Sequence, residues 1–250
     1  MKNKTIKNKI LLIILCFVII FSGCSVIYSG NDESIVYLLD SACTMIQQKS
    51  NLCAEIYIKT GNNIKSACIY FNPGKTLVDG ITNEYNAGIY KTRKFHLENN
   101  YWYIDKDEEK IVLYKDVVDS MQWLTDTEII YPEMIIKCVE PYRIFDKRYM
   151  IDTYNIIKTD SFNITKYSVI LNSDYNDTIN YICDGKVLSE FEGTIDYYIS
   201  NDMIERIELN ILRSHKSGAE RINTEAKIKI YPVDSIKLLT DKERVEYLQS

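Results

Sequence analysis

The chain has 250 residues and a net charge of -5, from 35 acidic and 30 basic side chains. An acidic chain lacks the basic surface that phosphate binding needs, so we expect no nucleic-acid partner. Seven cysteines and two histidines in a chain that is 46% hydrophobic indicate a sizeable core without a dense disulfide or metal framework.

The first 23 residues have the features of an export signal. Four lysines and no acidic residue precede twelve uncharged residues, Ile10 to Phe21, and a positive region before a short apolar core is typical of secretory signals. Twelve residues give about 18 Å of helix, which is too short for the roughly 30 Å of a bilayer core. We therefore predict that residues 1–23 are a signal peptide.

The end of this signal resembles the lipobox of bacterial lipoproteins. Small Ser22 and Gly23 precede Cys24, although Phe21 stands where leucine is usual. The resemblance implies diacylglycerol on Cys24, and two acyl chains are enough for stable anchoring. The alternatives are an ordinary secreted form and an uncleaved anchor. The predicted location is the extracytoplasmic face of the cell membrane, where loss of four lysines with the signal lowers the net charge to -9.

Residues 24–31 are predicted as a lipidated tether and residues 32–250 as a single domain, because no Pro/Gly/Ser-rich linker divides them. From Asp32, a favourable N-cap residue, apolar residues recur at helical spacing to about Ser50. Beyond it, alternating apolar and polar residues predict antiparallel strands with one buried face. The predicted strands are 52–59, 64–71, 76–81, 87–93, 95–98, 101–105, 111–114, 151–158, 164–171, 178–183, 187–192, 194–200, 204–213 and 222–231.

Turn and helix signals complete this pattern. Asn99-Asn100 and Asp184-Gly185 predict hairpin turns. Residues 117–124 have helical spacing, and 132–139 are predicted as a second short helix that begins at a proline. A capping box at 240–243 predicts a C-terminal helical turn. The predicted fold is α+β: a large curved antiparallel sheet in meander order, forming a half-barrel wrapped on the N-terminal helix and the short helical insertion.

This pattern resembles the LolA/LolB/LppX-like superfamily of bacterial lipoproteins over roughly residues 32–232. The residues that carry the resemblance are Cys24, the helix-to-strand entry at 34–59, the aromatic hairpin at 101–103, and the runs 193–199 and 204–209. The resemblance implies a half-barrel whose concave apolar side binds a hydrophobic ligand such as a lipid, without enzymatic activity.

A second use of the same architecture stays open. The clostridial spore-germination lipoproteins look similar, and that branch implies a protein-interaction module that activates a cell-wall enzyme during germination or sporulation. The sequence does not choose between the two uses, and it identifies no ligand-binding residue.

Few side chains carry chemistry. His96 and His215 are expected in a strand and a loop, and neither belongs to a nucleophile or zinc motif. The acidic run 105–109 lacks the alternating ligands and the glycine of a calcium loop, so we interpret it as an exposed hairpin tip. Glu190 and Glu192 share one face of a predicted strand, but acid/base catalysis also requires a raised pKa, so we interpret them as structural. We predict no enzyme, no metal and no cofactor.

The cysteines divide into three groups. Cys16 lies in the signal and Cys24 is the predicted anchor. Cys43 and Cys138 lie in predicted helices, where we interpret them as buried thiols. One disulfide stays open among the other three, because exported proteins meet oxidising conditions; these are Cys53, Cys68 and Cys183.

Twenty tyrosines accompany abundant Ile, Asn and Lys. Exposed tyrosine rings are suited to stacking on a carbohydrate. All four residue types have AT-rich codons, however, so a low-GC Gram-positive genome gives the same composition without any such ligand, and we prefer this interpretation.

Overall fold

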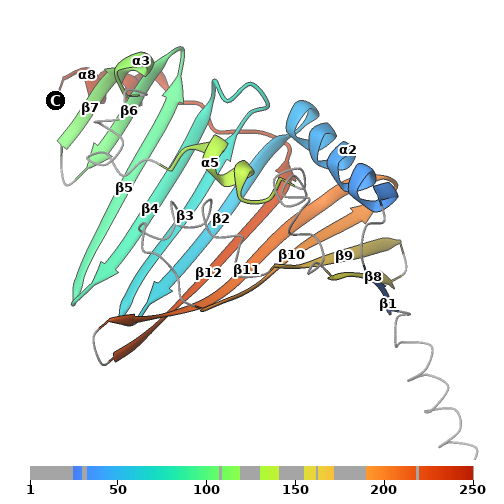
Figure 1. Ribbon diagram of the computed structural model, residues 1–250. Helices are drawn as coiled ribbons and strands as arrows, with labels where there is room; N and C mark the ends of the chain where they lie inside the picture. Colours follow the sequence, from blue (N-terminus) through green and yellow to red (C-terminus); the bar gives the residue numbers. More distant parts are fainter. Residues whose placement is uncertain are drawn as a thin grey trace, which may run out of the picture.

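The computed structural model describes residues 25–29, 33–106, 109–118, 130–140, 155–161, 163–171, 190–217 and 220–249. Within these ranges the strands form one antiparallel sheet of twelve. Figure 1 shows it as a broad, twisted layer whose two edges stay apart. The large antiparallel sheet that the sequence predicts is therefore confirmed. No helix in the described ranges is both long enough and apolar enough to cross a membrane.

The elements have the following bounds. The strands of the sheet are β1 (Ser25–Ser29), β2 (Asn51–Thr60), β3 (Asn63–Phe71), β4 (Val78–Asn86), β5 (Ile89–Glu98), β6 (Tyr101–Lys106), β7 (Glu109–Tyr114), β8 (Asn155–Ser161), β9 (Ile164–Leu171), β10 (Glu190–Ser200), β11 (Met203–Ser217) and β12 (Glu220–Val233). The helices are α2 (Glu33–Lys49), α3 (Lys115–Val118), α5 (Pro132–Lys137) and α8 (Asp241–Leu248).

The order of the strands corrects the predicted single meander. In space they run β1-β8-β9-β10-β11-β12-β2-β3-β4-β5-β6-β7. β2 to β7 form one meander and β8 to β12 form another, and the two join at the centre where β12 pairs with β2, for example at Ile228 opposite Ile56. Local alternation does not show which distant strands pair, so the sequence pattern could not reveal this junction.

The predicted tether is also corrected. Ser25–Ser29, expected as part of it, form β1 and pair with β8, from Ser25 opposite Thr159 to Ser29 opposite Asn155. Their Val-Ile-Tyr centre consists of residue types that favour strands, and the edge of a sheet offers unpaired backbone groups to such a segment. The sheet therefore begins at the residue that follows Cys24.

Several local predictions are confirmed, but two predicted breaks between strands are wrong. β9 has the predicted bounds 164–171, and Asn99 and Asn100 make the predicted turn with φ of 53° and 65°. β5 and β10 each continue through the breaks expected at Lys94 and Gly193, because both residues pair with the strands on either side. The turn at Asp184-Gly185 and the strand 178–183 lie outside the described residues.

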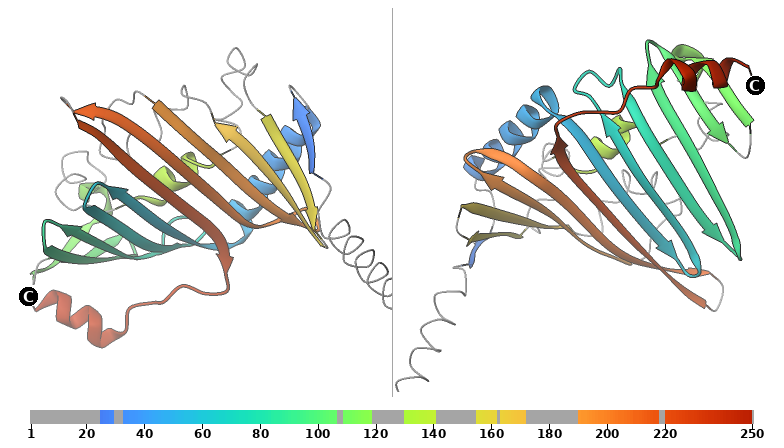
Figure 2. Two further views of the ribbon diagram at one scale, coloured as in Figure 1. Left: turned by 90° about the horizontal axis from the view of Figure 1, so that it is seen from below. Right: turned by 180° about the vertical axis from the view of Figure 1, so that it is seen from behind.

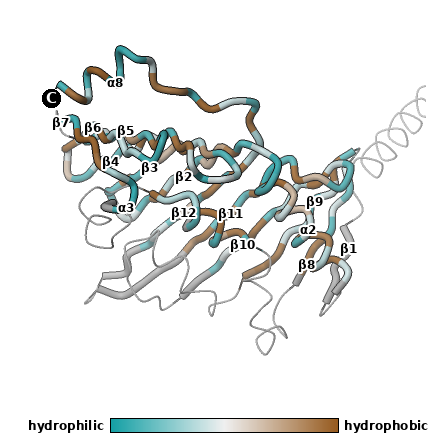
Figure 3. The backbone as a smooth tube through the Cα atoms, turned by 90° about the horizontal axis from the view of Figure 1, so that it is seen from above, coloured by the Kyte–Doolittle hydropathy of each residue, from teal (hydrophilic) through white to brown (hydrophobic). Residues whose placement is uncertain are grey.

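The helices lie on both sides of the sheet. Figure 2 shows α2 and α5 on one side, hereafter the inner side, and Figures 2 and 3 show α8 on the opposite, outer side. α2 lies over β11. Of the apolar stripe that the sequence predicts, Ile35, Leu39, Ala42 and Ile46 are buried, while Leu38 and Met45 are partly buried. The predicted helices at 32–50 and from Pro132 are thus confirmed, and both contribute to one core with the sheet.

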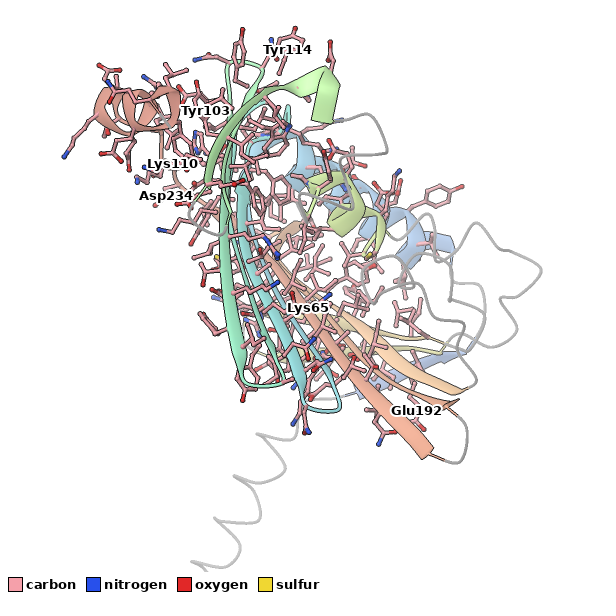
Figure 4. The ribbon with its side chains drawn as sticks, turned by 90° about the vertical axis from the view of Figure 1, so that its left-hand side faces the viewer. Lys65, Tyr103, Lys110, Tyr114, Glu192 and Asp234 are labelled. Carbon is pink, nitrogen blue, oxygen red and sulfur yellow. The ribbon has the colours of Figure 1, made fainter. Side chains whose placement is uncertain are left out.

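α8 is attached by polar and aromatic contacts, since none of its residues is buried. The predicted capping box is present, with Thr240 as its N-cap residue. Arg244 Nη2 donates to Glu98 Oε1 at 2.7 Å, and Lys110 Nζ donates to Glu246 Oε2 at 2.9 Å. Tyr103 and Lys110 lie beside α8 in Figure 4.

Replacing Arg244 with alanine is expected to release α8 while the sheet stays folded. The change removes a charge-assisted hydrogen bond to a largely buried carboxylate, and such a bond is worth about 1–2 kcal/mol. Hydrogen exchange of the α8 amides should accelerate by about tenfold, with little change in β5. Arg244→Lys, which keeps a cation, is the control. Unchanged protection of α8 in the alanine variant would contradict this role.

Candidate functional site

The inner face of the sheet is the candidate site, because it is the largest apolar surface that the strands share. Alternate residues of a strand point to the same face, and hydrophobic and hydrophilic residues alternate as brown and teal bands along the strands in Figure 3. The buried apolar residues of this face are Leu52, Ala54, Ile56, Ile58, Ala67, Ile69, Phe71, Val78, Phe95, Leu97, Trp102, Ile104, Ile156, Tyr167, Val169, Leu171, Ile195, Tyr197, Ile199, Ile204, Ile207, Leu209, Ile211, Ala226, Ile228 and Ile230.

α5 covers part of this face. Its Ile135 and Ile136 are buried in the shared core. The hydroxyl of Tyr197, on β10, donates a hydrogen bond to the carbonyl oxygen of Val139 at 2.9 Å. The ring of Tyr131, which precedes α5, meets the ring of Trp102 edge-on, with centroids 5.8 Å apart. Apolar packing, a buried hydrogen bond and an aromatic contact thus join this six-residue helix to the sheet.

Replacing Tyr197 with phenylalanine should lower the free energy of unfolding by about 1–2 kcal/mol. The variant keeps the ring but leaves the buried Val139 carbonyl without its donor, and an unsatisfied buried acceptor costs that much. Urea denaturation measures the loss. Tyr198→Phe is the matched control: it removes a part-buried hydroxyl on the other face, which donates to Glu208, and should cost less than half as much. Equal losses of unfolding free energy in the two variants would contradict a stabilising role of the hydrogen bond from Tyr197 to Val139.

Trp102 carries a polar group into this apolar region. The residue is 1% exposed, and its indole Nε1–H has no hydrogen-bond acceptor among the described residues. A buried donor without an acceptor costs free energy that water or a ligand oxygen would recover. Trp102 lies between Phe95, at a centroid distance of 6.1 Å, and Tyr131. The inner face therefore presents one hydrogen-bond donor within apolar surroundings next to α5.

A polar band bounds the apolar area towards the turns that join β2 to β3 and β4 to β5. The hydroxyls of Thr60 and Thr224 lie 3.0 Å apart. Arg93 is 5% exposed, and its guanidinium lies 4.0 Å from the carboxylate of Glu84. In the register, Lys65 lies directly opposite Glu84. The inner face is thus apolar at one end and polar at the other.

The residues that the sequence singled out do not converge on one site. Cys24 lies outside the described residues, as do Asp107 and Glu108 of the acidic run. Where the chain is described, no group of three metal-ligating side chains comes together. Cys43 and Cys138 are buried as predicted, and burial raises the pKa of the Cys43 thiol. Cys53 and Cys68 do come together, with sulfurs 3.7 Å apart.

Glu192 lies on the outer face, in a shallow groove over β10, β11 and β12. The groove is lined by Glu192, Gly193, Thr194, Asn210, Ile211, Leu212, Glu225 and Lys227. Figure 4 places Glu192 at the end of the sheet opposite Tyr114. Glu190 belongs to the same strand. Because the groove is wide open to solvent and charged side chains stand beside its apolar ones, it does not enclose an apolar ligand.

His96 takes part in a network that sequence patterns did not reveal. It is in β5 as predicted, whereas His215 is in β11 and not in a loop. The ring nitrogens of His96 lie 3.2 Å from Asp79 Oδ1 and 3.2 Å from Glu98 Oε2. Since Glu98 also accepts from Arg244 of α8, His96 belongs to the attachment of that helix. Glu98 is near His96 in sequence, but Asp79 and Arg244 are distant from it, so local spacing does not indicate the whole network.

Comparisons with known proteins find one weak structural similarity to report. No protein-family model matches the chain, and no curated protein matches it in sequence. Among solved structures the chain is similar to LprF from Mycobacterium bovis, at 12% identity and a TM-score of 0.43, over 84% of this chain and 97% of that one. Since a TM-score below 0.5 does not establish a common fold, the strand order above is the basis of the fold description.

Proposed function

We propose that this protein is a non-enzymatic lipoprotein of the extracytoplasmic membrane face, held by diacylglycerol on Cys24, which binds a hydrophobic ligand on the inner face of its sheet. The observation that carries the proposal is the inner face itself. Its apolar lining extends from β8 through the central strands to β6, and α2 and α5 lie on that side.

The mechanism is sequestration of an apolar chain between the sheet and α5. Burial of apolar surface contributes about 25 cal/mol per Å², so one acyl chain is worth several kcal/mol. α5 is the element that gives way, because its displacement exposes apolar surface that the ligand then covers. The apolar and polar ends of the face suit an amphiphile, such as a lipid with a polar head.

Trp102 supplies a test of the binding position. A ligand carbonyl or carboxyl beside α5 would accept from the indole Nε1–H, for which the described part of the chain provides no acceptor. One such bond contributes about 1 kcal/mol, or roughly fivefold in Kd. Trp102→Phe should therefore weaken binding of a pyrene-labelled fatty acid by about fivefold. Tyr103→Phe, on the outer face of the same strand, should leave the affinity unchanged.

Fluorescence titration of the folded variants separates the possible outcomes. Equal affinity of all variants for the probe would mean that the ligand does not bind at Trp102. A folded wild-type protein that binds no probe would contradict a lipid-binding inner face. Circular dichroism before each titration verifies that the variants are folded.

The start of β1 supports the proposed anchoring. β1 begins at Ser25, directly after the lipidated residue that we propose, and β1 pairs with β8. Without a spacer, a lipid on Cys24 would hold the edge of the sheet formed by these two strands close to the membrane. Ile164, at the adjacent turn between β8 and β9, is 37% exposed.

One observation favours the alternative function, a protein-interaction module that activates a cell-wall enzyme. The tip of the β4–β5 hairpin exposes three large apolar side chains, Tyr85, Ile89 and Tyr90, with exposed fractions of 42%, 61% and 65%. Exposed apolar groups that lie together are typical of protein contacts. Recovery of a stoichiometric cell-wall enzyme from membranes, abolished by Ile89→Asp, would favour this function over lipid binding.

A further inference from the structure

Two thiols meet on the outer face at the centre of the sheet. Cys53 Sγ, on β2, lies 3.7 Å from Cys68 Sγ, on β3. Both cysteines are free. The register places Cys53 opposite Tyr70 and Cys68 opposite Glu55, so the two cysteines are diagonal neighbours on adjacent strands.

The surroundings of the pair differ on its two sides. Cys53 is flanked by Tyr70 on β3 and by Tyr231 on β12, and it is 0% exposed. Cys68 is partly exposed. Burial raises the pKa of the Cys53 thiol to about 11. Cys68 is therefore the thiol that a reagent in solution reaches first.

The other thiols that the structure describes do not compete for this pairing. Cys43 lies in α2 and Cys138 follows α5, and both belong to the core on the inner side. Sheet residues separate them from the outer face. Cys183 lies outside the described residues, so the experiment must distinguish a Cys53–Cys68 disulfide from a disulfide to Cys183.

We propose that Cys53 and Cys68 form a disulfide across β2 and β3 when the protein meets a low-molecular-weight disulfide such as oxidised glutathione. The Cys68 thiolate attacks one glutathione sulfur and releases the other as a thiolate. The Cys53 thiol then loses its proton and attacks Cys68, which releases the second glutathione. The two protein thiols lose two electrons and two protons, and the oxidant becomes two glutathione thiols.

The geometry sets the character of this bond. A disulfide bond is about 2.05 Å long, so side-chain rotation and a small movement of the strands must bring the sulfurs closer by about 1.6 Å. A diagonal bond formed in this way is strained, and strained, partly accessible disulfides are readily reduced. The pair is thus a reversible modification site and not a permanent cross-link. This inference is independent of ligand binding and of lipid on Cys24.

Tryptic mapping of the full-length exported protein tests the pairing. Cleavage after lysine gives peptide 50–59, which holds Cys53, and peptide 66–75, which holds Cys68. After treatment with oxidised glutathione and alkylation, these peptides should appear as one disulfide-linked species, and the number of alkylated thiols should fall by two. Dithiothreitol without denaturant should restore both. The Tm of the oxidised form should be about 5 °C higher, because a 15-residue loop is closed.

Three variants make the result decisive. Cys68→Ser should abolish the linked species, while Cys43→Ala and Cys183→Ser should retain it. Separate alkylated peptides 50–59 and 66–75 in the oxidised wild-type protein would overturn the proposal, as would a link from either peptide to Cys183. If Cys68→Ser does not fold, Cys53→Ser replaces it, and the wild-type map alone still decides the pairing.

Discussion

Replacing Gly80 with alanine is expected to destabilise the protein by about 3 kcal/mol. Gly80, on β4, lies directly opposite Phe95, on β5, and both point to the inner face. A Cβ on Gly80 would lie 2.3 Å from two atoms of the Phe95 ring. Phe95 is 2% exposed and packed against its neighbours, and overpacking a core position typically costs about 1–3 kcal/mol, occasionally more.

A double-mutant cycle isolates this contact. Phe95→Ala alone should cost about 3–5 kcal/mol through the cavity that it creates. In that background Gly80→Ala should become neutral or stabilising, because the methyl group enters the vacated space and alanine relieves the entropic cost of glycine in a strand. Urea denaturation measures each variant. Gly74→Ala is the control, since its nearest neighbour would be at 3.8 Å, and additive losses in the cycle would contradict the proposed clash.

Replacing Cys24 with alanine should abolish lipid attachment altogether. The predicted thioether-linked diacylglycerol requires the thiol, and each buried CH₂ of an acyl chain contributes about 0.8 kcal/mol to membrane binding. Incorporation of labelled palmitate should fall to background, and partition into a detergent phase should fall by more than tenfold. Cys16→Ala is the matched control, because Cys16 lies inside the apolar run of the signal. An alanine variant at position 24 that carries as much label as wild type would contradict the anchor.

Local signals account for most of the elements that the sequence predicted correctly. The stripe from Ile35 to Ile46 defines α2, and Thr240 with Glu243 defines the start of α8. Asn99 and Asn100 both adopt positive φ in a turn, and the asparagine side chain tolerates that conformation well. Each of these signals depends on residues within a few positions of one another, so a single sequence is sufficient to read it.

The parts that sequence could not predict depend on distant residues. The pairing of β12 with β2 joins residues far apart in the chain, for example Ala226 and Ile58. The bond between Arg244 and Glu98 spans 146 positions. β1 was missed because five residues pair only when the edge of β8 is already present. Tertiary contacts, not local propensity, decide each of these features.

The candidate site was predictable in type but not in detail. Alternation in the strands predicted one buried face, and that face is present. The donor on Trp102 could not be found from sequence, because a tryptophan in a strand usually has an acceptor for its N–H. The contact between Cys53 and Cys68 depends on the β2–β3 register, which one residue of slip would change.

Native mass spectrometry of residues 25–250, purified without detergent, tests the central claim most directly. The inner face that we propose as a binding surface should retain a lipid through purification, so the spectrum should show the protein mass plus one defined lipid mass that organic extraction releases. A folded protein that carries only its own mass, and that gains no mass when incubated with phospholipid, would contradict ligand binding on the inner face.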